Sequence, residues 1–196
     1  MTAVWAHRGA SSTERENTVA AFEAAVRLGA DGVELDVRRA RDGRLLVHHD
    51  LLPAVVPPWV PTLAEALDAC GDLLVNVELK EPVGVEALPV LVGRNVLVSS
   101  FDLPSIDAIA GAVPTAWLVM APAPRIVATC VAHGHVALHP HHRVVRRRLV
   151  DAAHAAGLAL NTWTVDDPAR MRRLAAIGVD AIVTNDPALA LRTLRP

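Results

Sequence analysis

Three acidic residues lie within two short apolar runs of this 196-residue chain. Glu34 and Asp36 stand two apart in GVELDV, and Glu78 closes the run LVNVE. Residues two apart on a β-strand point to the same side, so Glu34 and Asp36 would lie together. Packed carboxylates repel one another unless a cation lies between them. An all-oxygen ligand set favours Mg²⁺ or Ca²⁺ over zinc, so we predict a divalent ion held by Glu34, Asp36 and Glu78.

Two histidines follow other apolar runs and could carry acid–base chemistry beside such an ion. His7 follows VWA and precedes Arg8, while His49 closes the run LLVHH. Imidazole is the side chain best suited to moving protons near neutral pH. His48 should point away from the site, into packing. Lys80, the single lysine beside 18 arginines, shares the strand face of Glu78, so we expect it next to the metal.

The spacing of apolar runs predicts the scaffold that positions these residues. Short runs alternate with helix-length segments, and from residue 74 the runs recur every 19 to 23 residues. Asp42-Gly43 indicates a hairpin that extends the second strand and carries His49. We predict an α/β fold, a compact (β/α)8 barrel, with an open doubly wound sheet as the alternative. The expected strands are 4–6, 32–37, 74–78, 96–99, 115–119, 136–138, 159–162 and 181–183.

Composition limits the classes of protein to consider. The chain is 52% hydrophobic and 20% charged, which predicts a single folded domain over residues 1–196. A net charge of −2 with interspersed signs argues against a nucleic-acid partner. No apolar run is long enough to span a bilayer, so we expect no stable membrane insertion and a cytoplasmic location. Cys70 and Cys130 lack metal-site spacing and are expected to be buried free thiols.

Several motifs, taken in order, resemble one enzyme family. The stretch from AHRGA through ENTVAAF, GADGVELD and ARDG to VHHD resembles the N-terminal half of the glycerophosphodiester phosphodiesterases. NVELK, VSSF, NTWTV and GVDAIVTNDP resemble later strands of that family. Together these motifs extend from residue 5 to residue 187.

The resemblance implies a metal-dependent TIM barrel that cleaves glycerophosphodiesters, small molecules of lipid and glycerol metabolism, to an alcohol and glycerol 3-phosphate. It implies acid–base roles for His7 and His49 without assigning which is the acid. It implies one Mg²⁺ or Ca²⁺ on Glu34, Asp36 and Glu78. Phosphate binding falls to Arg8 and Lys80. Beside these, Phe101 and Trp163 are candidates for packing against the carbon chain of the substrate.

The sequence also departs from the family pattern. Arg15 replaces the usual proline before ENT, tyrosine is absent, and the insertion after His49 is reduced to a short proline-rich loop. The short loop predicts an open site and keeps a lysophospholipase D-like activity on lipid phosphodiesters as an alternative. A non-catalytic phosphodiester-binding barrel is a further alternative, which the two histidines and three carboxylates argue against. We expect His139, His141 and His142 of the run LHPHH to lie in a loop near the site mouth, in preference to an H-x-H metal site.

Overall fold

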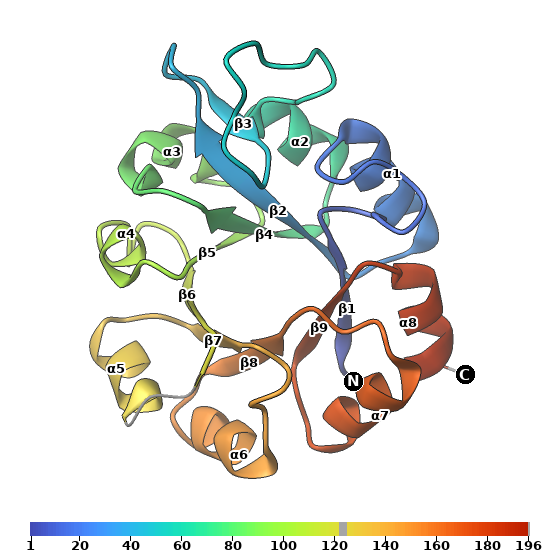
Figure 1. Cartoon of the computed structure of the whole chain (residues 1–196). Helices are drawn as coiled ribbons and strands as arrows, with labels where there is room; N and C mark the ends of the chain where they lie inside the picture. The colour runs from blue at the N-terminus through green and yellow to red at the C-terminus, as the bar shows by residue number, and fades with distance from the viewer. Residues whose placement is uncertain (122–124, 196) are drawn as a thin grey trace.

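The computed structural model describes residues 1–121 and 125–195. Across these residues, nine strands alternate with eight helices (Figure 1). The strands are β1 (Ala3–His7), β2 (Gly32–Arg39), β3 (Leu45–Val47), β4 (Leu74–Leu79), β5 (Val96–Ser100), β6 (Thr115–Val119), β7 (Ala137–Pro140), β8 (Ala159–Thr162) and β9 (Ala181–Thr184). The helices are α1 (Val19–Leu28), α2 (Leu63–Ala69), α3 (Gly84–Leu91), α4 (Leu103–Asp107), α5 (Ile126–Ala132), α6 (Arg147–Ala155), α7 (Pro168–Ala176) and α8 (Pro187–Leu194).

Eight of the strands form a closed parallel barrel, which confirms the predicted TIM barrel and excludes the open sheet. The hydrogen-bonded order is β1-β9-β8-β7-β6-β5-β4-β2, and β1 also pairs with β2, which closes the ring. The helices lie outside the strands around the whole ring (Figure 1). Because all eight strands run the same way, their C-terminal ends meet at one end of the barrel.

Local signals in the sequence explain where several helices begin. The Thr18 hydroxyl accepts from the Ala21 N–H at the start of α1. Thr62 and Glu65 form a reciprocal capping box at the start of α2. Asp167 and Asp186 cap α7 and α8, each followed by proline at the first helical position. These caps satisfy backbone N–H groups that the first turn of a helix leaves without a partner.

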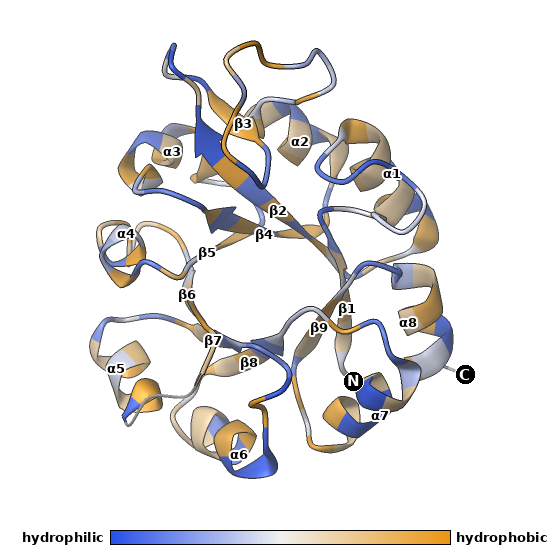
Figure 2. Cartoon of the chain, in the orientation of Figure 1, coloured by the Kyte–Doolittle hydropathy of each residue, from blue (hydrophilic) through white to orange (hydrophobic). Residues whose placement is uncertain are grey.

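The barrel has an apolar outer layer and an interior that changes from apolar to polar along its axis. Val33, Leu35 and Val37 of β2 point outward into the core shared with the surrounding helices. The alternation along β2 is visible in Figure 2. Trp5 belongs to an interior cluster with small and branched residues of other strands. The polar residues of β2 and β4 lie nearer the C-terminal ends of their strands.

A short hairpin and loop extend from β2, as the Asp42-Gly43 turn predicts. β3 pairs antiparallel with the end of β2. Residues 51–61 then return as a loop, in place of a larger insertion. The Trp59 ring in this loop lies 5.9 Å from the His48 ring and 4.4 Å from the Arg15 guanidinium carbon. Arg15 therefore joins the loop to the segment before α1 through a cation–π contact.

Two further expectations concern burial and membranes. Cys70 and Cys130 are both buried free cysteines, and burial raises the pKa of each thiol to about 12. Neither thiol is therefore ionised near neutral pH. Among the described helices, none combines the length and apolar character needed to cross a membrane.

Candidate active site

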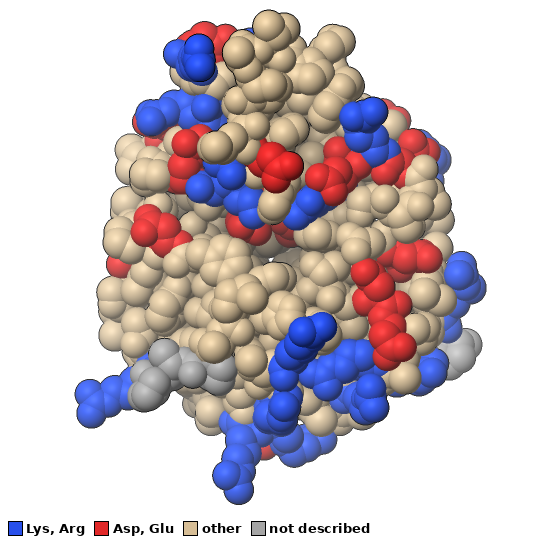
Figure 3. All heavy atoms as spheres, in the orientation of Figure 1, with Lys and Arg blue, Asp and Glu red and all other residues tan. Residues whose placement is uncertain are grey.

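Three neighbouring strands bring the predicted site residues to the C-terminal end of the barrel. His7 of β1 is in register with Glu34 of β2, and Asp36 is in register with Glu78 of β4. Lys80 follows β4, and its N–H donates to the Val37 carbonyl at 3.1 Å. In Figure 3, basic and acidic side chains lie side by side along one edge of the central depression.

Glu34, Asp36 and Glu78 form a compact acidic cluster, with one carboxylate oxygen from each within 4.8 Å of the others. Lys80 Nζ lies 2.6 Å from Glu78 Oε1 and 3.1 Å from Asp36 Oδ1. Arg8 Nε lies 3.0 Å from Asp36 Oδ2, and the Arg8 N–H donates to Glu34 Oε2 at 3.1 Å. Three carboxylates thus face two cationic side chains.

The pKa shifts follow from burial and from these charges. Burial raises the pKa of Glu34 well above its usual value, and the charges of Asp36 and Glu78 raise it further. Burial also raises the pKa of Glu78. Burial alone would raise the pKa of Asp36, but Lys80 and Arg8 outweigh it and lower that pKa. The two cations therefore balance Asp36 best and leave Glu34 with uncompensated repulsion.

The acidic cluster fits a divalent cation. Glu34 Oε1 is buried without a hydrogen-bond partner among the described residues. A small interior cavity of about 30 Å³ lies between His7, Glu34, Asn76 and Glu78 on one side and β6 to β9 on the other. That volume admits about one or two water-sized groups. The oxygen-only donor set suits Mg²⁺ or Ca²⁺, and the unpaired carboxylate oxygen and the small cavity are compatible with a bound ion.

The ring of His7 is held by a chain of polar contacts that also sets its tautomer. Asn185 Nδ2 donates to Asp166 Oδ2 at 2.7 Å, which turns Asn185 Oδ1 toward His7. His7 Nδ1 lies 2.6 Å from that oxygen and must carry the proton of this hydrogen bond. His7 Nε2 is left as a proton acceptor 3.8 Å from Glu34 Oε2. Burial lowers the pKa of His7, which favours this neutral form.

His49 lies at the edge of the site, in a more exposed position. Its Nδ1 is 2.8 Å from Asp50 Oδ1. Its backbone carbonyl accepts from Arg38 Nε at 2.8 Å, which ties the end of the hairpin to β2. Positive charge at His49 acts to lower the pKa of Glu78, but burial has the larger effect and the pKa of Glu78 is raised overall.

The turn after β1 holds Arg8 in a backbone conformation that few residues adopt. Arg8 has φ of 55°, and Gly9 has φ of 81°. A Cβ on Gly9 would come within 2.6 Å of the Ala21 backbone, so only glycine fits there. A non-glycine residue with positive φ costs energy and is concentrated at functional sites. The turn thereby directs the Arg8 guanidinium at Asp36.

The sequence reasoning missed two residues that support this turn. Asn17, with φ of 56°, donates from Nδ2 to Asp36 Oδ2 at 2.8 Å. Glu16 accepts from Arg8 Nη1 at 2.9 Å through each carboxylate oxygen. Both residues belong to the ENT motif, and asparagine tolerates positive φ. The motif therefore marked this turn, but the sequence alone did not indicate what either side chain would contact.

Phe101 and Trp163 come together at the opening of the barrel. Their ring centroids lie 5.5 Å apart in an edge-to-face arrangement. Trp163 Nε1 donates to the His139 carbonyl at 2.9 Å, which fixes the indole. Phe101 remains 44% exposed. Trp163 lines the interior cavity opposite Glu34 and Glu78, and Phe101 packs against the indole.

One expectation about the LHPHH run is wrong. His139 is a residue of β7 with its side chain inside the barrel, where the His139 Nε2 pairs with Asn161 Nδ2 at 2.9 Å. Burial lowers its pKa to about 3, so the ring is neutral. The strand extends two residues beyond the predicted end, and its alternation turns His139 inward. His141 and His142 do lie near Trp163, as expected for a loop at the mouth.

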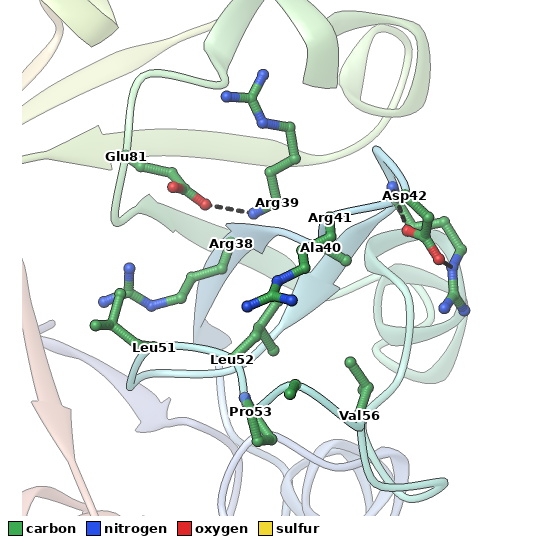
Figure 4. Close-up of a pocket in the computed structure, with 12 residues that line it drawn as sticks. Arg38, Arg39, Ala40, Arg41, Asp42, Leu51, Leu52, Pro53, Val56 and Glu81 are labelled. Carbon is green, nitrogen blue, oxygen red and sulfur yellow. Dashed lines mark hydrogen bonds and ion pairs between the residues drawn. The ribbon is translucent and has the colours of Figure 1, made fainter.

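A second pocket of about 480 Å³ lies between the β2–β3 hairpin and the loop after His49 (Figure 4). Basic residues of β2 and the hairpin line one side, and apolar loop residues such as Leu51 and Leu52 line the other. The Arg39 N–H donates to Glu81 at its rim. The reduced insertion therefore leaves a hollow close to His49, and no bulky segment among the described residues fills it.

The arginine run 146–148 lies at the start of α6, beside a shallow groove of about 650 Å³. Arg146 Nη1 donates to the Arg143 carbonyl at 2.8 Å, and Arg147 Nη2 donates to the Ala176 carbonyl at 2.9 Å. Arg170 also contacts the His142 carbonyl. These arginines contribute to the basic surface over α6 and α7 in Figure 3.

The chain is a closed parallel barrel with an acidic cluster at the C-terminal ends of its strands, and comparisons with known proteins identify its family. The model of the glycerophosphoryl diester phosphodiesterase family matches residues 7–81 and 90–189. The chain therefore belongs to this family, and it is a phosphodiesterase.

Individual relatives match along their full length. A glycerophosphodiester phosphodiesterase of Caldanaerobacter subterraneus is 31% identical, and the alignment covers 99% of this chain and 98% of the relative. One of Bacillus altitudinis is 28% identical, with 98% of each chain covered. An Oleispira antarctica phosphodiesterase, solved with sn-glycerol-3-phosphate, shares the fold with a TM-score of 0.88 at 24% identity, covering 100% of this chain and 98% of that one.

Proposed function

We propose that this protein hydrolyses glycerophosphodiesters to an alcohol and glycerol 3-phosphate, with one divalent cation on Glu34, Asp36 and Glu78. The observation that carries the proposal is the buried acidic cluster beside a histidine whose tautomer is fixed. The relatives named as glycerophosphodiester phosphodiesterases and the solved complex of a neighbour with glycerol 3-phosphate support the substrate class.

Charge neutralisation is the first requirement of the reaction. A phosphodiester monoanion repels nucleophiles, so its nonbridging oxygens must meet positive charge. When bound, Mg²⁺ or Ca²⁺ supplies Lewis-acid stabilisation of those oxygens. Arg8 and Lys80 lie on the same cluster and would turn part of their hydrogen bonding from Asp36 and Glu78 to the phosphate. Their charged hydrogen bonds would hold the phosphorus over His7.

The two histidines take different roles in this proposal. His7 Nε2 is the free acceptor and removes the proton from the attacking hydroxyl. If water attacks, glycerol 3-phosphate forms directly; if the glycerol 2-hydroxyl attacks, a cyclic phosphodiester forms and water then opens it to glycerol 3-phosphate. His49, whose Nδ1–H is held by Asp50, donates a proton from Nε2 to the leaving alkoxide. Asn185 and Asp166 keep His7 in the required tautomer, since their hydrogen bonds occupy Nδ1.

The alcohol group would leave through the open side of the site. Phe101 and Trp163 offer an apolar surface for a carbon chain, and the pocket beside the hairpin has room for a headgroup. Leu51 and Val55 of the loop are more than four-fifths exposed. This exposed apolar loop favours lipid phosphodiesters as a second candidate substrate class, cleaved as a lysophospholipase D would cleave them.

A headgroup panel tests the proposal. Glycerophosphocholine, glycerophosphoethanolamine, glycerophosphoglycerol and a lysophospholipid are each incubated with the enzyme and Ca²⁺ or Mg²⁺. The product measured is glycerol 3-phosphate for the water-soluble diesters and lysophosphatidic acid for the lysophospholipid. We expect turnover of at least one water-soluble diester, and loss of at least about 100-fold in His7→Ala and Glu34→Ala. The exposed substitution His154→Ala is the matched control and should keep full turnover.

Other outcomes discriminate between the alternatives. Turnover of the lysophospholipid alone would favour the lipid candidate. Binding of diesters with no turnover under any ion would favour a non-catalytic barrel. Unchanged turnover in His7→Ala would contradict the assignment of the histidines.

A further inference from the structure

A second group of metal-ligating side chains lies at the other end of the barrel from the catalytic cluster. Asp107 ends α4, His133 follows α5, and His135 precedes β7. One ligand atom from each of these three lies within 4.8 Å of the others. Thr115, which contacts His135, is the first residue of β6, whereas the catalytic residues follow the ends of their strands. The two clusters therefore occupy opposite ends of the barrel.

The local sequence places the imidazoles of His133 and His135 on the same side of the reversal between α5 and β7. His133, Gly134 and His135 form an H-x-H motif at the reversal between α5 and β7. Gly134 has φ of 75°, which permits this tight reversal. The rings of His133 and His135 lie 6.0 Å apart with 24° between their planes. Both therefore face the Asp107 carboxylate at the end of the neighbouring helix, α4 (Figure 1).

Two buried atoms of this group have no hydrogen-bond partner among the residues that the structure describes. They are His135 Nε2 and Asp107 Oδ1, which lie 3.2 Å apart. His135 is only 4% exposed, so water does not compensate for the missing hydrogen bond. Two ligand atoms held about 2.05 Å from a tetrahedral ion lie about 3.3 Å apart. The observed spacing matches that of two ligands of a common ion.

A neighbouring hydroxyl is placed to hold His135 in the tautomer that binds a metal through Nε2. Thr115 Oγ1 lies 2.8 Å from His135 Nδ1. With the Nδ1–H donating to this hydroxyl, the lone pair of the neutral ring is on Nε2, the atom that faces Asp107. Metal-binding histidines are oriented in this way by a partner on the second ring nitrogen.

We propose that Asp107, His133 and His135 form a second metal site, selective for a transition-metal dication such as Zn²⁺. Two imidazole nitrogens and one carboxylate oxygen favour Zn²⁺, Co²⁺ or Ni²⁺ over the oxygen-seeking Mg²⁺ and Ca²⁺. The ion would join the end of α4 to the α5–β7 turn and stabilise the fold there. This site and the phosphodiester site lie at opposite ends of the barrel. The second ion would therefore have a structural role and take no part in hydrolysis.

A similar pair elsewhere in the chain provides a matched control. His154 Nε2 lies 2.8 Å from Asp180 Oδ2, but the same oxygen also accepts from the Leu160 N–H at 2.7 Å. No second histidine joins this pair in the clusters found among the described residues. It is a histidine–aspartate ion pair without the third ligand that would complete a site.

The test titrates the metal-depleted full-length protein with Zn²⁺ by calorimetry, and with Co²⁺ by visible absorption, in the presence of saturating Mg²⁺. The variants are His133→Gln, Thr115→Val and the control His154→Gln. We expect one Zn²⁺ whose Kd rises by about tenfold or more in His133→Gln and Thr115→Val. We expect no change in His154→Gln, and unchanged phosphodiester turnover in all three variants.

Thermal unfolding gives an independent readout, because an ion that binds only the folded state raises Tm. At the same concentration, Zn²⁺ should raise Tm of the wild type and of His154→Gln by more than it raises Tm of His133→Gln. The proposal is overturned if the wild type binds neither Zn²⁺ nor Co²⁺. It is equally overturned if His133→Gln and Thr115→Val bind Zn²⁺ like the wild type. Neither result depends on whether the protein hydrolyses glycerophosphodiesters.

Discussion

Replacing Glu34 with glutamine should stabilise the metal-free protein while abolishing its activity. Glu34 is buried, its Oε1 has no hydrogen-bond partner among the described residues, and burial together with Asp36 and Glu78 raises its pKa. Glutamine has the same shape, keeps an oxygen for the Arg8 N–H, and adds an NH₂ that can donate to the neighbouring carboxylates. Repulsion in the metal-free state is therefore replaced by hydrogen bonding.

The size of the effect follows from the spacing of the charges. Two unit charges at the 4.8 Å limit of this cluster repel by about 3.5 kcal/mol at an effective dielectric constant of about 20. Arg8 and Lys80 offset part of this repulsion, so we expect a net gain of about 2 kcal/mol in the free energy of unfolding. For a chain of this length, that gain corresponds to a rise in Tm of about 4 to 8 °C.

Thermal unfolding in EDTA at pH 7.5 measures the gain, and glycerol 3-phosphate release with Mg²⁺ or Ca²⁺ measures the loss of activity. Glu23→Gln, the same chemical change on the exposed surface of α1, is the control and should alter neither quantity appreciably. The reasoning is refuted if Glu34→Gln lowers Tm in EDTA, or if it turns over substrate like the wild type.

Three further predictions follow from the geometry. Asn185→Ala removes the partner of His7 Nδ1 and should lower kcat by about 10- to 100-fold with little change in KM. Steady-state kinetics across a range of pH measure the effect, and an unaltered kcat would contradict the prediction. Lys80→Arg should lower kcat/KM by about tenfold or more, because a planar guanidinium cannot replace the Nζ that lies between Glu78 and Asp36, while circular dichroism stays unchanged. His139 has a pKa of about 3 when folded and 6.5 as its unperturbed value, so as pH falls below 6.5 the unfolded chain gains a proton that the folded chain excludes. Unfolding free energy should therefore fall by up to about 1.4 kcal/mol per pH unit from this residue, and denaturant titrations of His139→Gln should show a slope smaller by that amount.

The barrel could be predicted because its signals are local and repeated. Caps such as Thr62 with Glu65, and Asp167 before a proline, mark helix starts wherever the chain later packs. The 19- to 23-residue repeat then leaves room for one strand and one helix per unit. Strand alternation also predicts that Glu34 and Asp36 share a face, and the register of β2 and β4 places Glu78 beside them.

What the sequence could not predict depends on contacts between distant segments. The hydrogen bond from His7 to Asn185 joins residues 178 positions apart, and only barrel closure between β1 and β9 creates it. His139 was expected in a loop after a strand that ends at residue 138, yet β7 extends to Pro140 and carries the ring into the interior. Asp107 and His135 likewise belong to separate helix–strand units, and neither unit alone indicates a shared site.

The most direct test of the central claim follows the phosphorus of glycerophosphocholine by ³¹P NMR while divalent cation is returned to the metal-depleted enzyme. We predict no conversion in EDTA and restoration by Mg²⁺ or Ca²⁺, with glycerol 3-phosphate as the phosphorus-containing product. Full conversion in EDTA, or phosphocholine as the product, would contradict the assignment of Glu34, Asp36 and Glu78 to a catalytic ion and of the bond that is cleaved.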